Sequence, residues 1–263
     1  MVQKGVTFEF EGKKVRGVLH VPESVGRFPC IINVHGFAGG MYEPLQQELA
    51  KRAASVGFCC FLFDFYDKPF GKTEISHDEA SLTLQLAILK RAVEVVSSMK
   101  KVDASCIFLV GHSLGASCAL LFANRHRVQG VVAIAPVWNF GKTLDSSPAA
   151  LQYYAGKEFI EFGEDFHHVR VRRRFIEDAL GYDVADEVLT LNCSILIVHG
   201  KADTIVPITQ SEEIMRHLGT RAGFCAISEG GHNFYQKEAL DMVMESIMSF
   251  LKRISRSGAG DSR

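Results

Sequence analysis

The sequence predicts an α/β fold built on a mostly parallel sheet of eight strands. A series of short, nearly continuous apolar runs is the first observation, because such runs are typical of strands buried on both faces. Amphipathic segments separate most of these runs, as expected of helices that connect parallel strands and cover both faces of a sheet. An apolar content of 47% in 263 residues is enough for the core of one large domain.

The sheet is expected to begin with a hairpin, because "VTFEFEG" and "KKVRGVLHVP" alternate apolar and polar residues around Glu11 and Gly12. The six remaining strands are predicted from the runs "CIINVHG", "GFCCFLFD", "CIFLVG", "VQGVVAIAP", "CSILIVHG" and "GFCAIS". Helical periodicity predicts helices over residues 42–55, 78–99, 114–126, 208–218 and 236–253.

One interval interrupts this alternation. More than fifty residues separate Pro136 from the next buried strand, too many for an ordinary connection. Within the interval, "KEFIEFGEDFHHVRV" predicts a small hairpin that turns at residues 163–165, and "RRRFIEDAL" predicts a short helix that ends at Gly181. We therefore expect a core of residues 1–136 and 193–254, a cap insertion of residues 137–192 and a flexible tail of residues 255–263.

Charge and composition narrow the choice of partner. The 29 Lys and Arg residues balance 30 Asp and Glu residues, so no net field favours nucleic acid or an anionic membrane. No apolar run reaches the roughly 18 residues of a membrane helix, and the start of the chain has no signal-peptide core. Most of the seven cysteines lie in apolar runs, where reduced thiols pack as small hydrophobes. These features predict a cytoplasmic protein, monomeric or homodimeric, that acts on a small molecule without nucleic acid or membrane.

A lone serine stands where a buried strand turns into a helix. In "IFLVGHSLGASCALLF", the apolar run ends at Gly111, and Ser113 lies between two glycines. A G-x-S-x-G turn lifts the serine hydroxyl above the sheet edge, next to the amides of a helix start. Because the required strand and helix flank it, the pattern predicts that Ser113 is a nucleophile.

A serine nucleophile needs a base to take its proton and an acid to orient that base. Asp203 follows the seventh strand in "ILIVHGKADTIVP", and His232 follows the eighth in "GFCAISEGGHNF". Both should lie at the sheet edge that carries Ser113, because the carboxyl ends of parallel strands meet there. The chain order Ser, Asp, His suits this arrangement. We predict a catalytic triad of Ser113, Asp203 and His232.

Two other residues compete for roles in this triad. His112 adjoins the nucleophile, but the turn directs the side chains of neighbours apart. Glu229 could replace Asp203 as the acid, although it lies only three residues from His232 and on the same loop.

Cofactor sites receive little support. His167 and His168 with Asp165 lack further metal-ligand spacing, and a solvated hairpin explains them better. "FGKT" lacks the first glycine of a phosphate loop, because Tyr66 stands in its place. We therefore expect no metal and no cofactor.

Four ordered motifs carry a resemblance to a known family: "HGF" at 35–37, "GHSLG" at 111–115, "HGKADTIVP" at 199–207 and "GGHNF" at 230–234. With them the chain, from about residue 5 to residue 253, resembles the α/β-hydrolases, which are serine hydrolases with a Ser-Asp-His triad. "VHGF", "FDF" and "GHSLGA" with a cap of about fifty residues look most like the cinnamoyl and feruloyl esterase and serine-aminopeptidase-like branch. "DFYDKPFGKT" departs from the Gly-His-Gly-x-Ser that the family often has at this loop.

The resemblance implies the α/β-hydrolase fold and an oxyanion hole made by the backbone N–H groups of Phe37 and Leu114. Such amides stabilise the charge that develops on a carbonyl oxygen under attack. His35 is expected to support this loop beside the substrate, or else to be a buried turn residue, and is not expected to act as a base.

The expected function is the hydrolysis of carboxylic esters, with short or aromatic acyl groups, through an acyl-Ser113 intermediate. A peptidase or an acyl-thioesterase would use the same groups, since specificity lies in the cap and the loops. A non-catalytic binding protein with this fold is the alternative class. The cap is expected to offer Trp138, Tyr153 and Tyr154 to the substrate, although such aromatics also serve to pack a cap onto its core.

Overall fold

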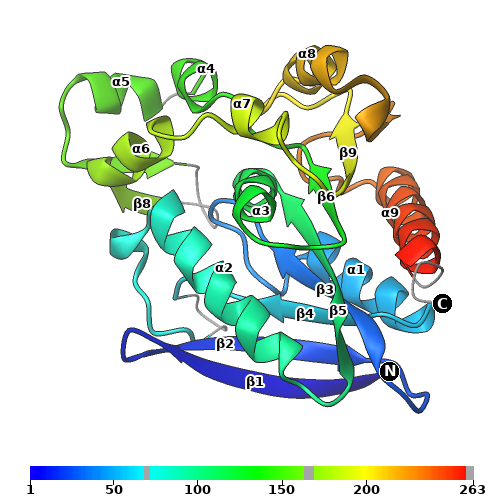
Figure 1. Ribbon diagram of the computed structural model, residues 1–263. Helices are drawn as coiled ribbons and strands as arrows, with labels where there is room; N and C mark the ends of the chain where they lie inside the picture. Colours follow the sequence, from blue (N-terminus) through cyan, green and yellow to red (C-terminus); the bar gives the residue numbers. More distant parts are fainter. Residues whose placement is uncertain (68–71, 148, 163–168, 259–263) are drawn as a thin grey trace.

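The computed structural model describes residues 1–67, 72–147, 149–162 and 169–258. Its centre is an eight-stranded sheet in the order β1-β2-β4-β3-β5-β6-β9-β10 (Figure 1). Strand β2 pairs antiparallel with β1 and β4, and the other neighbours pair in parallel, which confirms the predicted fold class. The strands are β1 (Val2–Phe10), β2 (Lys13–Val21), β3 (Phe28–Val34), β4 (Cys59–Phe63), β5 (Val102–His112), β6 (Gly130–Ile134), β9 (Ser194–Gly200) and β10 (Ala222–Ile227).

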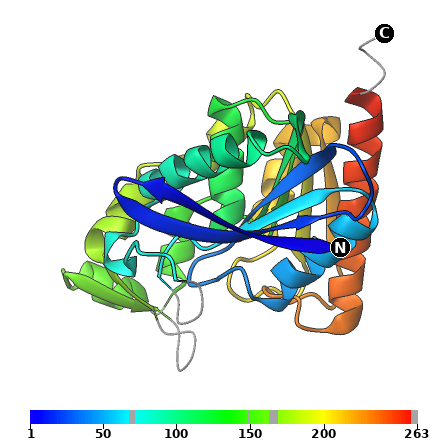
Figure 2. The same cartoon turned by 90° about the horizontal axis from the view of Figure 1, so that it is seen from below.

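Helices cover both faces of the sheet (Figure 2). Helices α2 and α3 pack on one face, and α1 and α9 pack on the other. The five helices outside the segment between β6 and β9 are α1 (Pro44–Ser55), α2 (Leu82–Ser97), α3 (Leu114–Arg125), α8 (Thr209–Leu218) and α9 (Lys237–Gly258). Among the described residues, η1 (His77–Glu79) and η3 (Gly219–Arg221) are 3-10 turns. All five helices occur where the periodicity predicted them. Helix α9 continues to Gly258, so part of the expected tail is helical, and residues 259–263 lie outside the described residues.

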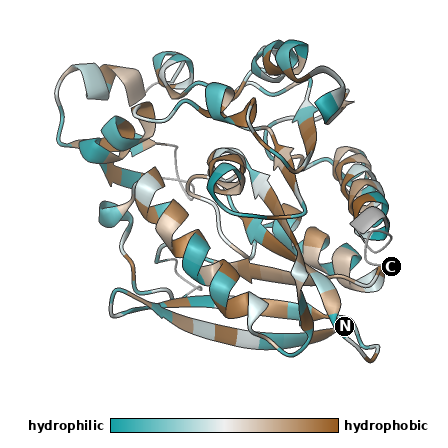
Figure 3. Ribbon diagram, viewed as in Figure 1, coloured by the Kyte–Doolittle hydropathy of each residue, from teal (hydrophilic) through white to brown (hydrophobic). Residues whose placement is uncertain are grey.

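Burial on both faces explains the continuous apolar runs. In β3, Cys30 and Ile32 belong to the core on the α2 side, and Ile31 belongs to the core on the α1 side. Successive residues of a strand point to opposite faces, so a strand covered twice needs apolar residues at every position. Figure 3 shows this as hydrophobic colour along the central strands.

A separate set of elements lies between β6 and β9. These are α4 (Phe140–Asp145), α5 (Ala149–Tyr154), β7 (Phe159–Phe162), β8 (Val169–Arg172), α6 (Arg173–Leu180) and α7 (Val184–Val188). Strands β7 and β8 pair antiparallel as the expected hairpin, whose turn lies outside the described residues. Helix α6 ends at the expected Gly181, without a left-handed residue, since φ of Gly181 is −74°. We call residues 137–192 the cap; its α6 packs on α2, and its α7 on α3.

Along the described residues, every helix is too short or too polar to cross a membrane.

Candidate active site

Ser113 occupies a strained turn between β5 and α3. Its φ is 54° and its ψ is −124°, in a region that residues with a Cβ rarely adopt. Hydrogen bonds hold this backbone: the Ser113 N–H donates to the Ile134 carbonyl at 2.8 Å, and the Ser113 carbonyl accepts from the Ala116 N–H at 2.9 Å. The strained serine is therefore fixed by β6 on one side and α3 on the other.

The two glycines of the motif are required by close backbone approach. A Cβ at Gly111 would lie 2.4 Å from the Gly115 carbonyl oxygen, and a Cβ at Gly115 would lie 2.1 Å from the Val34 carbonyl oxygen. Both distances are shorter than any real contact, so only glycine fits. The strand-to-helix turn predicted at this motif is confirmed.

Ser113, His232 and Asp203 form one chain of hydrogen bonds. The Ser113 Oγ lies 2.9 Å from His232 Nε2, and His232 Nδ1 lies 2.7 Å from Asp203 Oδ2. The other oxygen, Asp203 Oδ1, accepts from the N–H groups of Ile205 at 2.9 Å and Val206 at 2.8 Å. The Nδ1–H of His232 thus points at a carboxylate, which leaves Nε2 free to accept the Ser113 proton.

The fold brings the Asp203 and His232 loops together at two glycines. These loops follow β9 and β10, which pair in parallel. A Cβ at Gly200 would lie 2.0 Å from the Gly230 carbonyl oxygen, so the two loops touch there through their backbones. The N–H of Ala202 also donates to the Gly230 carbonyl at 3.0 Å.

His199 is a second histidine beside Asp203, and the sequence pattern did not reveal this role. This fully buried side chain places its Nε2 3.3 Å from Asp203 Oδ2 and donates from Nε2 to the Val206 carbonyl at 2.8 Å. Burial alone would raise the pKa of Asp203, but hydrogen bonds from His199 and His232 outweigh it and hold that pKa well below its usual range. The available signal was a histidine inside the apolar run "SILIVHG".

Trp138 was expected to contact the substrate. It instead lies in a chain of hydrogen bonds that leads through Ser211 to His199, beside Asp203. It is 3% exposed, and its Nε1–H donates to Ser211 Oγ at 2.9 Å. Ser211 in turn lies 2.8 Å from His199 Nδ1, which accepts the hydroxyl proton because Nε2 carries the ring proton. The Trp138 ring does not line either cavity at Ser113, which corrects the expectation.

Three further expected substrate contacts also lie outside these two cavities. Tyr153 packs its ring on the Arg173 guanidinium, 4.1 Å away, and Tyr154 is 68% exposed with its hydroxyl bonded to Asp145. His35 is buried, and its Nε2 accepts the Phe65 N–H at 3.2 Å. The cap tyrosines therefore pack the cap, and His35 supports the backbone at its own loop.

The loop of residues 35–41, which we call the oxyanion loop, lies against the serine. A Cβ at Gly36 would be 3.2 Å from Ser113 Cβ, so the two backbones are close neighbours. Neither the Phe37 N–H nor the Leu114 N–H donates a hydrogen bond to any group in the described parts of the chain. Leu114 is the first residue of α3, a position whose N–H has no partner within the helix.

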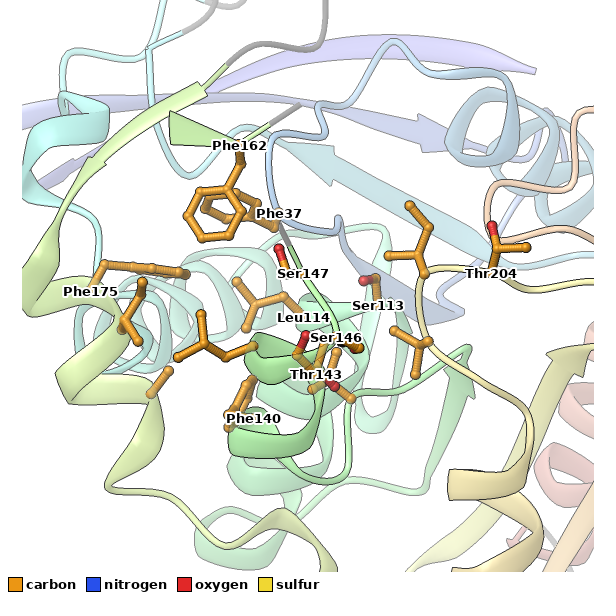
Figure 4. Close-up of a pocket in the computed structure, with 16 residues that line it drawn as sticks. Phe37, Ser113, Leu114, Phe140, Thr143, Ser146, Ser147, Phe162, Phe175 and Thr204 are labelled. Atoms are coloured by element: carbon orange, nitrogen blue, oxygen red, sulfur yellow. Dashed lines mark hydrogen bonds between the residues drawn. The ribbon is translucent and has the colours of Figure 1, made fainter. Parts of the chain in front are cut away.

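Two cavities meet at Ser113. An apolar one of ≈ 270 Å³ extends toward the cap (Figure 4). Its lining includes Leu114, Val137, Phe140, Leu144, Phe175 and Ile176. A more polar one of ≈ 560 Å³ lies on the His232 side. Its lining includes Glu43, His112, Gln152, Glu161, His232 and Asn233. Ser113 and the oxyanion-loop residue Phe37 line both cavities, so the serine stands at their junction.

His112 and Glu229, the two alternatives considered for the triad, do not occupy triad positions. His112 donates from Nε2 to the His232 carbonyl at 2.8 Å, and burial, followed by the neighbouring His232, lowers the pKa of His112 to about 3. It is therefore a neutral structural donor. Glu229 is exposed, and Asp203 occupies the position beside His232 Nδ1.

The metal candidates His167, His168 and Asp165 lie outside the described residues. No group of three His, Cys, Asp or Glu side chains suited to a metal ion occurs in the part of the chain that is described.

Comparison with known proteins agrees with this architecture. The model of the alpha/beta hydrolase family matches residues 34–244. The chain belongs to the alpha/beta hydrolase family.

Its relatives include an esterase and a thioesterase. The esterase EstD of Thermotoga maritima is 29% identical over 127 residues, which cover 46% of this chain but only 30% of EstD. Human palmitoyl-protein thioesterase ABHD10, a mitochondrial protein, is 24% identical over 240 residues, covering 88% of this chain and 75% of that protein.

A solved structure shares the fold over nearly its whole length. Est1E of Butyrivibrio proteoclasticus with bound ferulic acid superposes with a TM-score of 0.83 at 20% identity, covering 95% of this chain and 99% of Est1E. At this level of identity the similarity shows the fold alone.

Proposed function

We propose that the protein is a serine hydrolase that cleaves carboxylic esters through an acyl-Ser113 intermediate. The observation that carries the proposal is the hydrogen-bonded chain of Ser113, His232 and Asp203 at the junction of two cavities. A strained serine, a histidine base and a buried carboxylate in this order are the parts that acyl transfer needs. The similarity to the esterase EstD supports the same reaction class.

In the first half of the proposed reaction, His232 Nε2 takes the proton as Ser113 Oγ attacks the carbonyl carbon. Asp203 holds the imidazole tautomer and stabilises the imidazolium. The amides of Phe37 and Leu114 receive the oxyanion, and each such donor contributes about 3–4 kcal/mol to the transition state. The ester C–O bond then breaks, and His232 gives its proton to the leaving alcohol.

In the second half, a water molecule attacks the acyl-serine carbonyl while His232 removes its proton. The bond between the acyl carbon and Ser113 Oγ breaks, and His232 returns the proton to Oγ. The products are a carboxylic acid and the free enzyme.

The proton that His232 delivers decides which cavity holds the leaving group and which holds the acyl group. His232 must reach both Ser113 Oγ and the leaving oxygen, so the leaving group lies in the polar cavity that His232 lines. The acyl group then enters the apolar cavity, which Leu114 lines and His232 does not.

The apolar cavity indicates the acyl class. Its volume of ≈ 270 Å³ is slightly below the usual range for ligand pockets, about 300 to 1,000 Å³. Aromatic and branched aliphatic walls such as Phe140, Leu144 and Ile176 suit an apolar acyl group. We expect short or aromatic acyl esters to be preferred over long lipid chains.

A thioester substrate is the second candidate, favoured by the likeness to ABHD10 over 88% of this chain. The same Ser113 and His232 chemistry applies, and a thiolate leaves with less need of protonation, because thiols have a pKa near 8.5. A peptidase would need full protonation of the leaving amine by His232.

A substrate panel tests the proposal. Purified protein and its Ser113→Ala variant are assayed with p-nitrophenyl acetate and hexanoate, a feruloyl ester, an aminoacyl amide and an acyl-thioester. We expect ester turnover by the wild type only, with amide turnover lowest. If the wild type turns over none of these substrates, the chain is better described as a binding protein with a hydrolase fold.

We also propose that the protein works in the cytoplasm on a small-molecule ester. All seven cysteines are unpaired, as is usual in a reducing compartment. Fractionation of cells that express the protein tests this location.

A further inference from the structure

We propose that two phenylalanines of the cap, Phe162 and Phe175, hold the oxyanion loop in its catalytic position by clamping the ring of Phe37. This inference rests on the proposed function, because it assigns Phe162 and Phe175 as positioning residues for the oxyanion hole. It makes the cap part of the catalytic geometry as well as a wall of the acyl cavity.

The clamp is a cluster of three rings. Phe175 of α6 stacks on Phe37 with a centroid distance of 5.0 Å and an interplanar angle of 26°. Phe162, at the end of β7, meets Phe37 edge-on at 4.9 Å and 73°. Figure 4 shows the Phe37 and Phe162 rings together, with Phe175 beside them on the side away from Ser113. Aromatic pairs of this kind stabilise a structure by more than the burial of their apolar area alone. The position of the Phe37 ring therefore depends on both cap rings.

Residues outside the cap hold the oxyanion loop on both sides of Phe37. The Met41 N–H donates to Asp64 Oδ1 at 2.7 Å, and the Phe65 N–H donates to His35 Nε2 at 3.2 Å. Inside the loop, the Gly39 N–H donates to the Gly36 carbonyl at 3.0 Å. The two aromatic partners of the Phe37 ring, by contrast, come from the cap.

The loop needs this outside support because its backbone is strained. Ala38, the residue after Phe37, has a φ of 58°, which costs free energy for a residue with a Cβ. A strained segment persists only where its surroundings hold it. Loosening the cap rings should therefore let the backbone at Phe37 relax, and the proposed oxyanion donor is the N–H of that same residue.

Helix α6 is itself hydrogen-bonded to helix α2 outside the cap. Asp178 accepts the Thr83 N–H at 2.9 Å and the Thr83 hydroxyl at 2.6 Å. These bonds lie in the first turn of α2, where a carboxylate also interacts favourably with the helix dipole. The position of Phe175 is thus set by the start of α2, far along the sequence from the oxyanion loop.

The inference predicts a loss of turnover that a simple pocket wall would not cause. An acetyl group is too small to fill the acyl cavity, so replacing a wall residue should change its turnover little. Displacing the Phe37 N–H should slow every ester, because the transition state loses part of one oxyanion donor. Full loss of such a donor costs about 10²–10³ in kcat, so a partial displacement should cost about tenfold.

The test compares Phe175→Leu and Phe162→Leu with Phe159→Leu, using p-nitrophenyl acetate. Phe159 lies on the same strand as Phe162, but its ring packs on Arg170 and Arg172 at 4.4 Å and 4.8 Å instead of on Phe37. We expect the two clamp variants to lower kcat about tenfold at a nearly unchanged KM. We expect Phe159→Leu to match the wild type, and equal kcat in all four proteins would overturn the inference.

Amide hydrogen exchange of residues 36–41 gives a readout that needs no substrate. Exchange should be faster in both clamp variants than in the wild type and in Phe159→Leu. If the wild type proves unable to cleave any ester, the proposed function fails, and faster exchange in the clamp variants would still support the clamp. Unchanged exchange in the clamp variants would refute it.

Discussion

His199 Nε2 lies 3.3 Å from the same oxygen of Asp203 that His232 Nδ1 reaches at 2.7 Å. Asp203 therefore lies between two histidines, of which only His232 contacts Ser113. His199 is held in one orientation by Ser211 at Nδ1 and by the Val206 carbonyl at Nε2. A carboxylate positioned in this way cannot rotate away from His232 without losing other hydrogen bonds.

Replacing His199 with Phe should lower kcat about tenfold, because Asp203 loses one of the groups that orient it. The free energy of unfolding should fall by about 1–3 kcal/mol, since the Ser211 hydroxyl and the Val206 carbonyl lose a buried partner. Steady-state kinetics and urea unfolding measure both effects. Trp138→Phe is the control: it removes the indole donor to Ser211 and part of a buried ring but leaves His199 in place, so it should cost stability and leave kcat within about twofold. Equal kcat in wild type and His199→Phe would show that His199 only fills space.

Asp203→Asn should leave a folded protein whose kcat falls by about 10³–10⁴, because an amide cannot hold the His232 tautomer or stabilise its charged form. Glu229→Gln is the matched control, because this exposed side chain lies on the same loop as His232. The kinetics of both variants on one ester decide between the two acids. A crippled Glu229→Gln with a benign Asp203→Asn would reverse the assignment.

His112 should make the protein less stable as the pH falls. Burial lowers the pKa of His112 from its ordinary 6.5 to about 3, so in this range the unfolded chain binds the proton and the folded protein does not. The free energy of unfolding is therefore not reduced by His112 above pH 6.5, and His112 reduces it progressively as the pH falls toward 3. At pH 5 the loss should be about 2 kcal/mol.

The measurement is the free energy of unfolding in urea at pH 7 and pH 5, for the wild type and for His112→Gln. Glutamine can still donate to the His232 carbonyl but does not titrate. Contributions of the other histidines cancel in the difference between the two proteins. A variant that loses as much stability as the wild type between these pH values would contradict the assignment.

Gly200→Ala should damage the site from a distance. The added Cβ would meet the Gly230 carbonyl oxygen at 2.0 Å and force apart the loops that carry Asp203 and His232. We expect a loss of about 1–3 kcal/mol in stability together with a fall in kcat. Gly231→Ala serves as the control, because nothing lies within 4 Å of a Cβ at that position. Thermal unfolding and ester kinetics should separate the two variants; similar behaviour would mean that the loops can move apart freely.

The sequence was informative where structure depends on local pattern. Apolar runs revealed the strands, and the glycines around Ser113 revealed the turn, because a buried strand and a tight backbone approach leave few choices of residue. Asp203 and His232 could be proposed from their places after two strands, since parallel strands bring their carboxyl ends to one edge.

It was less informative about residues that meet only through tertiary packing. Trp138 was expected in the substrate site because it is a large aromatic of the cap, but its partner is Ser211 on α8. Phe175 lines the acyl cavity, and periodicity alone does not tell which side of a small cap faces Ser113. His199 was overlooked because a strand pattern does not reveal that a histidine faces a carboxylate on the following loop.

The central claim is that His232 and Asp203 make Ser113 a nucleophile. The most direct measurement is the mass spectrum of the protein after treatment with a fluorophosphonate, followed by digestion to locate the modified residue. We predict one added phosphonyl group on the peptide that contains Ser113, with labelling lost in Ser113→Ala and greatly slowed in His232→Ala. Addition at another serine, or no addition to the folded wild type, would contradict the account.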